Sequence, residues 1–228
     1  GALNTTNLNA ISTTQIAALT STDVGEFSST QIAALSVAQL GAISVGNLAG
    51  LTTTQIGGLS STQIASLTTT KFSALDGTQI GSLNVTQVRG VTAAQIAALS
   101  TTDVQEFNET QIAALSTTQL AALNATNVNA LPTTQLTGLS ATQLGSFSAT
   151  SLSALDATQV GSLTETQVRG LTNLQLAALN TTDLGEFNET QIGALTRTQI
   201  GWLSGTQISN LTATQTGALN ATQLGALS

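Results

Sequence analysis

Large apolar residues recur along this chain in alternating steps of five and three residues, beginning with Leu3, Leu8 and Ile11. From Leu3 to Leu227 the chain divides into 28 units of eight, with no insertion or deletion. Each octad reads Leu-Ser/Thr/Asn-x-Thr-Gln-Ile/Leu/Val-Gly/Ala-small, and position one is always Leu, Ile, Val or Phe. The chain, residues 1–228, is therefore interpreted as a single array of 28 octads spanning residues 3–226.

This spacing excludes one long helix and one long strand. Eight residues at ~100° each rotate by ~800°, so an apolar stripe would shift by ~80° around a helix in every octad. Steps of five and three are both odd, so along a strand they would place successive apolar residues on opposite faces. The backbone must therefore change direction within every octad.

Position two indicates where the direction changes. It is Ser, Thr, Asn or Asp in every octad except the one with Pro132, and these residue types are the preferred helix N-caps. Position five, three residues later, is usually Gln, and the pair Ser116 and Gln119 has the spacing of a capping box. The apolar residues at positions one and six, such as Leu115 and Leu120, are spaced as a hydrophobic staple. Each octad thus predicts the start of one helix, with proline fitting at the first helical position.

The octads predict an all-α solenoid of very short capped helices, of one to two turns each, in an elongated rod. Such helices are far below the ~12–15 residues needed for independent stability, so stacking must stabilise them. Position six, for example Ile112 and Ile192, is expected in the core, and Thr216 is the one polar residue there. A substitution of Thr216 by Ile is therefore expected to stabilise the fold. A β-solenoid is the alternative, because Thr-rich repeats with little charge also suit strands, but it leaves the capping box unexplained.

A longer period of ten octads overlies the single octad. The segment 23–27 recurs at 103–107 and again at 183–187. If the position of a residue within a coil matters, the number of octads per coil should divide ten, so that residues ten octads apart occupy the same position. This favours a coil of two octads over one of three or four. With two octads per coil, the chain would form about 14 coils and a rod on the order of 110–140 Å long.

Composition excludes several classes of function. The chain has no His and no Cys, so it lacks an imidazole base, a thiolate, disulfides and the usual ligand sets for zinc, copper or iron. Four basic residues against eleven acidic ones give a net charge of -7, which disfavours nucleic acid and anionic lipid as partners. No stretch approaches the ~18 apolar residues of a membrane helix. Lys71 and the serines have no base partner, so we expect no enzyme activity and no cofactor.

Pairs of acidic residues three apart are weak candidates for a calcium site. They are Asp23 with Glu26, Asp103 with Glu106, and Asp183 with Glu186. Calcium takes six to eight oxygen ligands, more than one such pair supplies. The favoured interpretation is structural, because Asp at position five can replace Gln in the capping box and suits a helix N-terminus.

Threonine at position four suggests a possible ligand surface. It occurs in 24 of the 28 octads, and a regular array of Thr with little charge is what an ice-binding face requires. The favoured interpretation is again structural, because a hydroxyl residue in the first helical turn can satisfy free backbone groups.

The octads, typified by LSTTQLAALNATN at residues 115–127, resemble short TQ-type repeats of very long bacterial secreted and cell-surface proteins often labelled adhesin-like. The resemblance implies an exported, extracellular and non-catalytic spacer or stalk. The position-four threonines supply the second hypothesis, an ice-binding array. Both ends of the sequence lie within an octad, so we interpret it as a fragment of a longer array. The expected partners are neighbouring repeats of the parent chain, with end-to-end self-association of the fragment.

Overall fold

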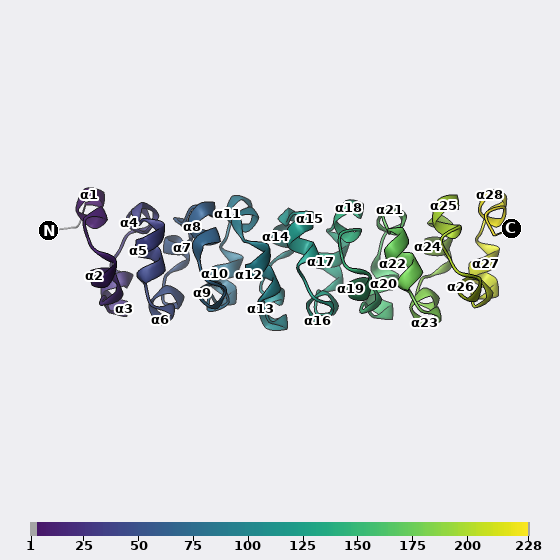
Figure 1. Ribbon diagram of the computed structural model, residues 1–228, viewed down its shortest axis with the longest axis horizontal. Helices are drawn as coiled ribbons and strands as arrows, with labels where there is room; N and C mark the ends of the chain where they lie inside the picture. The colour runs from purple at the N-terminus through teal and green to yellow at the C-terminus, as the bar shows by residue number, and fades with distance from the viewer. Residues whose placement is uncertain (1–3, 228) are drawn as a thin grey trace. The chain divides into compact units, whose positions relative to one another are not determined.

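Residues 4–227 are described by the computed structural model, and the regular secondary structure among them is entirely α-helical. Leu3, the first apolar residue of the array, lies outside this range. Contacts divide the chain into two units, Gly1–Leu115 and Ser116–Ser228, each described by itself. The described residues form one helix per octad, of four to six residues, which confirms the predicted helical solenoid (Figure 1).

The helices of the first unit are α1 (Thr5–Asn9), α2 (Thr13–Ala17), α3 (Ser21–Gly25), α4 (Ser29–Ala34), α5 (Val37–Ala42), α6 (Val45–Ala49), α7 (Thr53–Gly57), α8 (Ser61–Ser66), α9 (Thr69–Phe72), α10 (Gly77–Gly81), α11 (Val85–Gly90), α12 (Ala93–Ala97), α13 (Thr101–Gln105) and α14 (Glu109–Ala114). Those of the second unit are α15 (Thr117–Ala121), α16 (Ala125–Asn129), α17 (Thr133–Thr137), α18 (Ala141–Leu144), α19 (Ala149–Ser153), α20 (Ala157–Ser162), α21 (Glu165–Arg169), α22 (Asn173–Ala178), α23 (Thr181–Gly185), α24 (Glu189–Ala194), α25 (Arg197–Ile200), α26 (Gly205–Ser209), α27 (Ala213–Gly217) and α28 (Ala221–Leu224).

Helix α15 shows how one octad produces one helix. Ser116 has an extended backbone with φ -70° and ψ 161°, and its hydroxyl accepts a hydrogen bond from the Gln119 N–H. The Gln119 side-chain oxygen accepts in turn from the Ser116 N–H at 2.7 Å. The helix ends at Ala121, and just beyond it the Leu123 N–H donates to the Leu120 carbonyl. No non-glycine residue within 4–227 has a positive φ, so the chain passes from helix to helix through extended residues at positions one and two.

Pro132 is the N-cap of α17 rather than its first helical residue. Its φ of -58° and ψ of 151° are those of an extended cap, and the helix begins at Thr133. The expected position is thus wrong by one residue. Proline fits the cap because its ring fixes φ near the value that an extended N-cap adopts here.

Three octads form one coil. The extensive contacts between helices join each one to the third helix along the chain, as in the columns α1, α4, α7, α10 and α2, α5, α8, α11, α14 of the first unit. The second unit has the same step, for example α15, α18, α21, α24 and α27. The expected coil of two octads is therefore wrong. Octads of the same consensus occupy all three positions of the coil. A duplicated block of ten octads therefore fits the coil even though ten is not a multiple of three.

The core of each unit consists of positions one and six. Leu115, Ile112, Leu120 and Ile192 are each at most 2% exposed. Position six is covered by the coil that follows, so in the last described coil Thr216 is exposed.

We predict that the two position-six substitutions differ sharply. Ile112→Asp places an unpaired charge in the core and should lower the free energy of unfolding by roughly 3–5 kcal/mol. Thr216→Ile should change it by less than about 0.5 kcal/mol, because the side chain is exposed; this corrects the gain expected from sequence. Urea unfolding followed by circular dichroism measures both. Equal effects would contradict the assignment of the core.

Candidate functional site

The side-chain amide at position five is the most regular polar feature of the structure. The Gln87 carboxamide oxygen accepts from the Asn84 N–H at 2.9 Å, which completes the capping box of α11. Its nitrogen Nε2 donates to the carbonyls of Ile56 at 2.9 Å and Leu59 at 2.8 Å, at the C-terminal end of α7. Gln87 is only 2% exposed. One carboxamide therefore closes the start of one helix and the end of another in the preceding coil.

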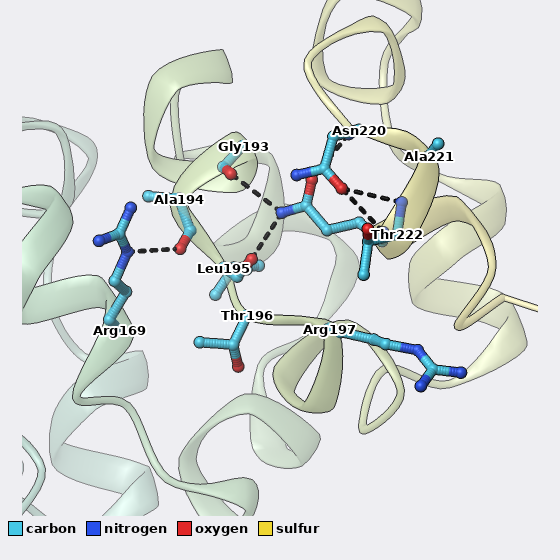
Figure 2. A pocket seen from close by; sticks show the side chains of 10 residues that line it. Arg169, Gly193, Ala194, Leu195, Thr196, Arg197, Asn220, Ala221 and Thr222 are labelled. Atoms are coloured by element: carbon cyan, nitrogen blue, oxygen red, sulfur yellow. Dashed lines mark hydrogen bonds between the residues drawn. The ribbon is translucent and has the colours of Figure 1, made fainter.

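This arrangement repeats through both units, and we call it the glutamine ladder. Its donors reach carbonyls 31 and 28 residues earlier in the chain, as seen for Gln39, Gln95, Gln111, Gln191 and Gln207. In a variant of this arrangement, Gln223 donates to the carbonyls of Gly193, 30 residues earlier, and Leu195. Both acceptor residues are labelled in Figure 2. The ladder matters because the last carbonyls of a helix have no partner within it, and burying them unpaired is costly.

Other residues at position five also supply a donor. Asn47 Nδ2 donates to the Leu19 carbonyl at 2.7 Å, and the Ser151 hydroxyl donates to the Leu123 carbonyl at 3.3 Å. The Lys71 ammonium donates to the Gly41 carbonyl. Burial lowers the pKa of this lysine. Lys71 is thus part of the ladder.

Sequence reasoning assigned the glutamines to the capping box alone and missed their second role. The signal was in the composition of position five. Gln occupies 20 of its 28 places and Glu none, although Glu serves a capping box as well as Gln does. The amide of Gln offers the acceptor that the cap needs together with two donors for the preceding coil, whereas the carboxylate of Glu offers no donor.

Aspartate at position five forms capping boxes but cannot donate. Asp103 accepts from the Ser100 N–H at 2.9 Å, and Asp23 and Asp183 occupy the same place in their helices. Hydrogen bonds from the hydroxyl and then the N–H of Thr20 lower the pKa of Asp23. Asp103 also accepts from the Ser73 hydroxyl at 2.5 Å, across the coils.

The second unit repeats that bond ten octads later. There the Ser153 hydroxyl donates to the Asp183 carboxylate. In both units the serine lies 30 residues before the aspartate. Sequence reasoning did not pair these residues, because the pairing depends on the coil of three octads.

Glu106 and Glu186 lie in clusters of like charge. Burial, followed by the charges of Asp103 and Asp76, raises the pKa of Glu106. Burial, followed by Asp183 and Asp156, raises the pKa of Glu186 in the same way. Within residues 4–227, no three acidic side chains are arranged to hold a metal ion. The structure thus gives the calcium candidates Asp23, Asp103 and Asp183 hydrogen-bonding roles.

An open hollow of about 610 Å³ in the second unit brings together two of the four basic residues (Figure 2). Arg169 Nε donates to the Ala194 carbonyl at 3.0 Å, and its guanidinium lies 3.7 Å from the Glu165 carboxylate. Arg197 lies on the other side of the hollow, and the two guanidinium groups point away from one another. They do not converge on an anion.

Comparison with known proteins finds one repeat family that matches part of the chain. Residues 32–69 match the model of the ALTTAQ repeat family, within the first unit. No curated protein matches the chain. Helices long and apolar enough to span a bilayer are absent from the described part of the chain. The chain is a repeat array, with both units built from the same octad.

We predict that the ladder can be weakened without removing a cap. Gln87→Glu keeps the acceptor for Asn84 but removes both donors and buries a charge, so it should cost roughly 3–5 kcal/mol at pH 7. Burial beside carbonyls should raise the pKa of the new carboxyl above its unfolded value of about 4.3, so the loss should shrink as the pH falls through the folded pKa. Denaturant titrations at pH 7 and pH 4 measure this.

The chain offers a matched control. Gln15 is exposed, and its carboxamide oxygen accepts from the Ser12 N–H at 2.9 Å. Gln15→Glu should therefore change stability by less than about 0.5 kcal/mol. Equal losses in the two variants would show that the buried donors of Gln87 add nothing to stability, which would contradict the ladder.

Proposed function

We propose that this chain is a structural repeat segment that acts as an extended spacer or scaffold in a large exported surface protein. The glutamine ladder carries the proposal. Each coil is joined to the preceding one by buried amides that most octads supply for themselves, so coils can be added without new kinds of contact. A segment whose length changes freely while its interfaces stay the same suits a spacer.

The surface supports the same function. Positions two to four are mostly exposed and carry small hydroxyl, amide and methyl side chains, as in Ser116, Thr117 and Thr118. The arginines at the hollow in the second unit do not converge. A surface with few charges and a net charge of -7 keeps the segment dispersed while offering little to bind.

A ligand-binding array is the second candidate, and one observation favours it. The position-four threonines are exposed, for example Thr14, Thr118 and Thr222. With three octads per coil, each column of helices presents one such residue per coil. Ice is the ligand that a periodic, uncharged hydroxyl array fits best. Thermal hysteresis of the purified chain would support this function, and its absence would leave the spacer.

We predict that length in the first unit changes by whole coils. Thr14 and Thr110 are twelve octads, or four coils, apart, and the chain has no Cys to interfere with spin labels placed there. At ~8–10 Å per packed helix, the labels should lie ~32–40 Å apart. Deleting residues 51–74, which make up one coil, should shorten the distance between them by ~8–10 Å and leave the helix content per residue unchanged.

A deletion of residues 51–70 is the control, because it removes two and a half octads and breaks the octad frame. It should unfold the region between the labels and broaden the distance distribution measured by double electron–electron resonance. A whole-coil deletion that behaves like this control would contradict a modular spacer.

A further inference from the structure

Two junctions between coils lack the donor that the glutamine ladder provides elsewhere. They are the places where Asp103 and Asp183 occupy position five. Gln87 donates to the carbonyl of Leu59, 28 residues earlier. The residues 28 before the two aspartates are Leu75 and Leu155, so their carbonyls are the corresponding acceptors. A carboxylate can only accept, so each aspartate accepts from a serine of the earlier coil instead. We call these places the acidic junctions.

Asn47 shows what a neutral side chain of the same length does at this position. Its Nδ2 reaches the Leu19 carbonyl, also 28 residues earlier, at 2.7 Å. Asparagine has the shape of aspartate, and its amide adds the donor that a carboxylate lacks. An asparagine in place of Asp103 would therefore have the same carbonyl register within reach.

A second carboxyl lies at each acidic junction. Glu106 packs against Gly77 of the earlier coil so closely that a Cβ at Gly77 would lie 3.2 Å from its Cγ. Its Oε2 is buried and accepts no hydrogen bond from the described residues. The charged groups that act on it are Asp103 on α13 and Asp76, the N-cap of α10.

The second unit repeats this charge arrangement. Asp183 on α23 and Asp156, the N-cap of α20, act on Glu186. In both units the charged groups that raise the pKa of the glutamate are carboxylates. At neutral pH, like charges therefore face one another across the coils.

We propose that the acidic junctions are acid-closing joints, which bind protons and hold adjacent coils together more tightly in mildly acidic surroundings than at neutral pH. Protonation of Glu106 and Glu186 removes the repulsion between these side chains and the aspartates that act on them. This device goes beyond the spacer function. It would make the stability of the array depend on pH at two defined places.

The sign follows from the direction of the shifts. The raised pKa values of Glu106 and Glu186 mean that the folded state binds these protons more tightly than the unfolded state. Their contribution to stability therefore increases as the pH falls from neutral through the folded pKa. Asp23 acts in the opposite direction because its pKa is lowered, so a test must compare variants that retain it.

The test uses melting of the full chain, followed by circular dichroism at pH 7 and pH 4.5. Glu106→Gln with Glu186→Gln removes the two half-buried charges, and at pH 7 it should raise Tm by about 2–4 °C. Its Tm should also rise less than that of the wild type on acidification. Asp103→Asn with Asp183→Asn removes charges that raise the pKa of Glu106 and Glu186, and should likewise reduce the acid gain.

Glu109→Gln with Glu189→Gln is the matched control. These residues are exposed, lie ten octads apart like the test pair, and change the net charge equally. The control should keep the acid gain of the wild type. The proposal would be overturned if the control and the Glu106/Glu186 variant showed the same dependence on pH, or if the wild type gained nothing in acid relative to that variant.

Discussion

A single carboxamide that serves two helix ends is the interaction on which this structure depends. Helices of four to six residues leave most of their backbone groups unpaired within the helix, so an array of them requires partners at nearly every turn. The oxygen of Gln87 satisfies the start of its own helix, and the nitrogen satisfies the end of a helix in the preceding coil. Without this dual role, each coil would bury carbonyls with no donor.

The ladder also specifies how the coils stack. Aliphatic residues at positions one and six fill the core in a non-directional way, and several coil sizes could bury them. Two hydrogen bonds from one planar amide are directional and reach carbonyls 31 and 28 residues earlier. That separation is compatible with a coil of three octads. The aliphatic core supplies the stabilisation, and the buried amides select the register.

Much of this fold could be predicted from the sequence because its signals are local. The octad, the cap at Ser116 and its partner Gln119 lie within a few residues of one another, and they predict short capped helices directly. The number of octads per coil could not be predicted in this way, because contacts between coils depend on three-dimensional packing. The ten-octad period suggested the wrong coil, since equivalent octads allow a duplicated block to fall anywhere. The link from Ser73 to Asp103 became visible only once the coil of three octads was known.

Hydrogen exchange of the glutamine side-chain amides, resolved by NMR, tests the central claim most directly. Gln87 and Gln95 are each 2% exposed and donate to two carbonyls of the preceding coil, whereas Gln15 is exposed. The account predicts that the Nε2 protons of the two buried residues exchange at least about 100-fold more slowly than those of Gln15, which corresponds to an opening free energy of ~3 kcal/mol. Exchange of all three carboxamides at the rate of Gln15 would contradict it.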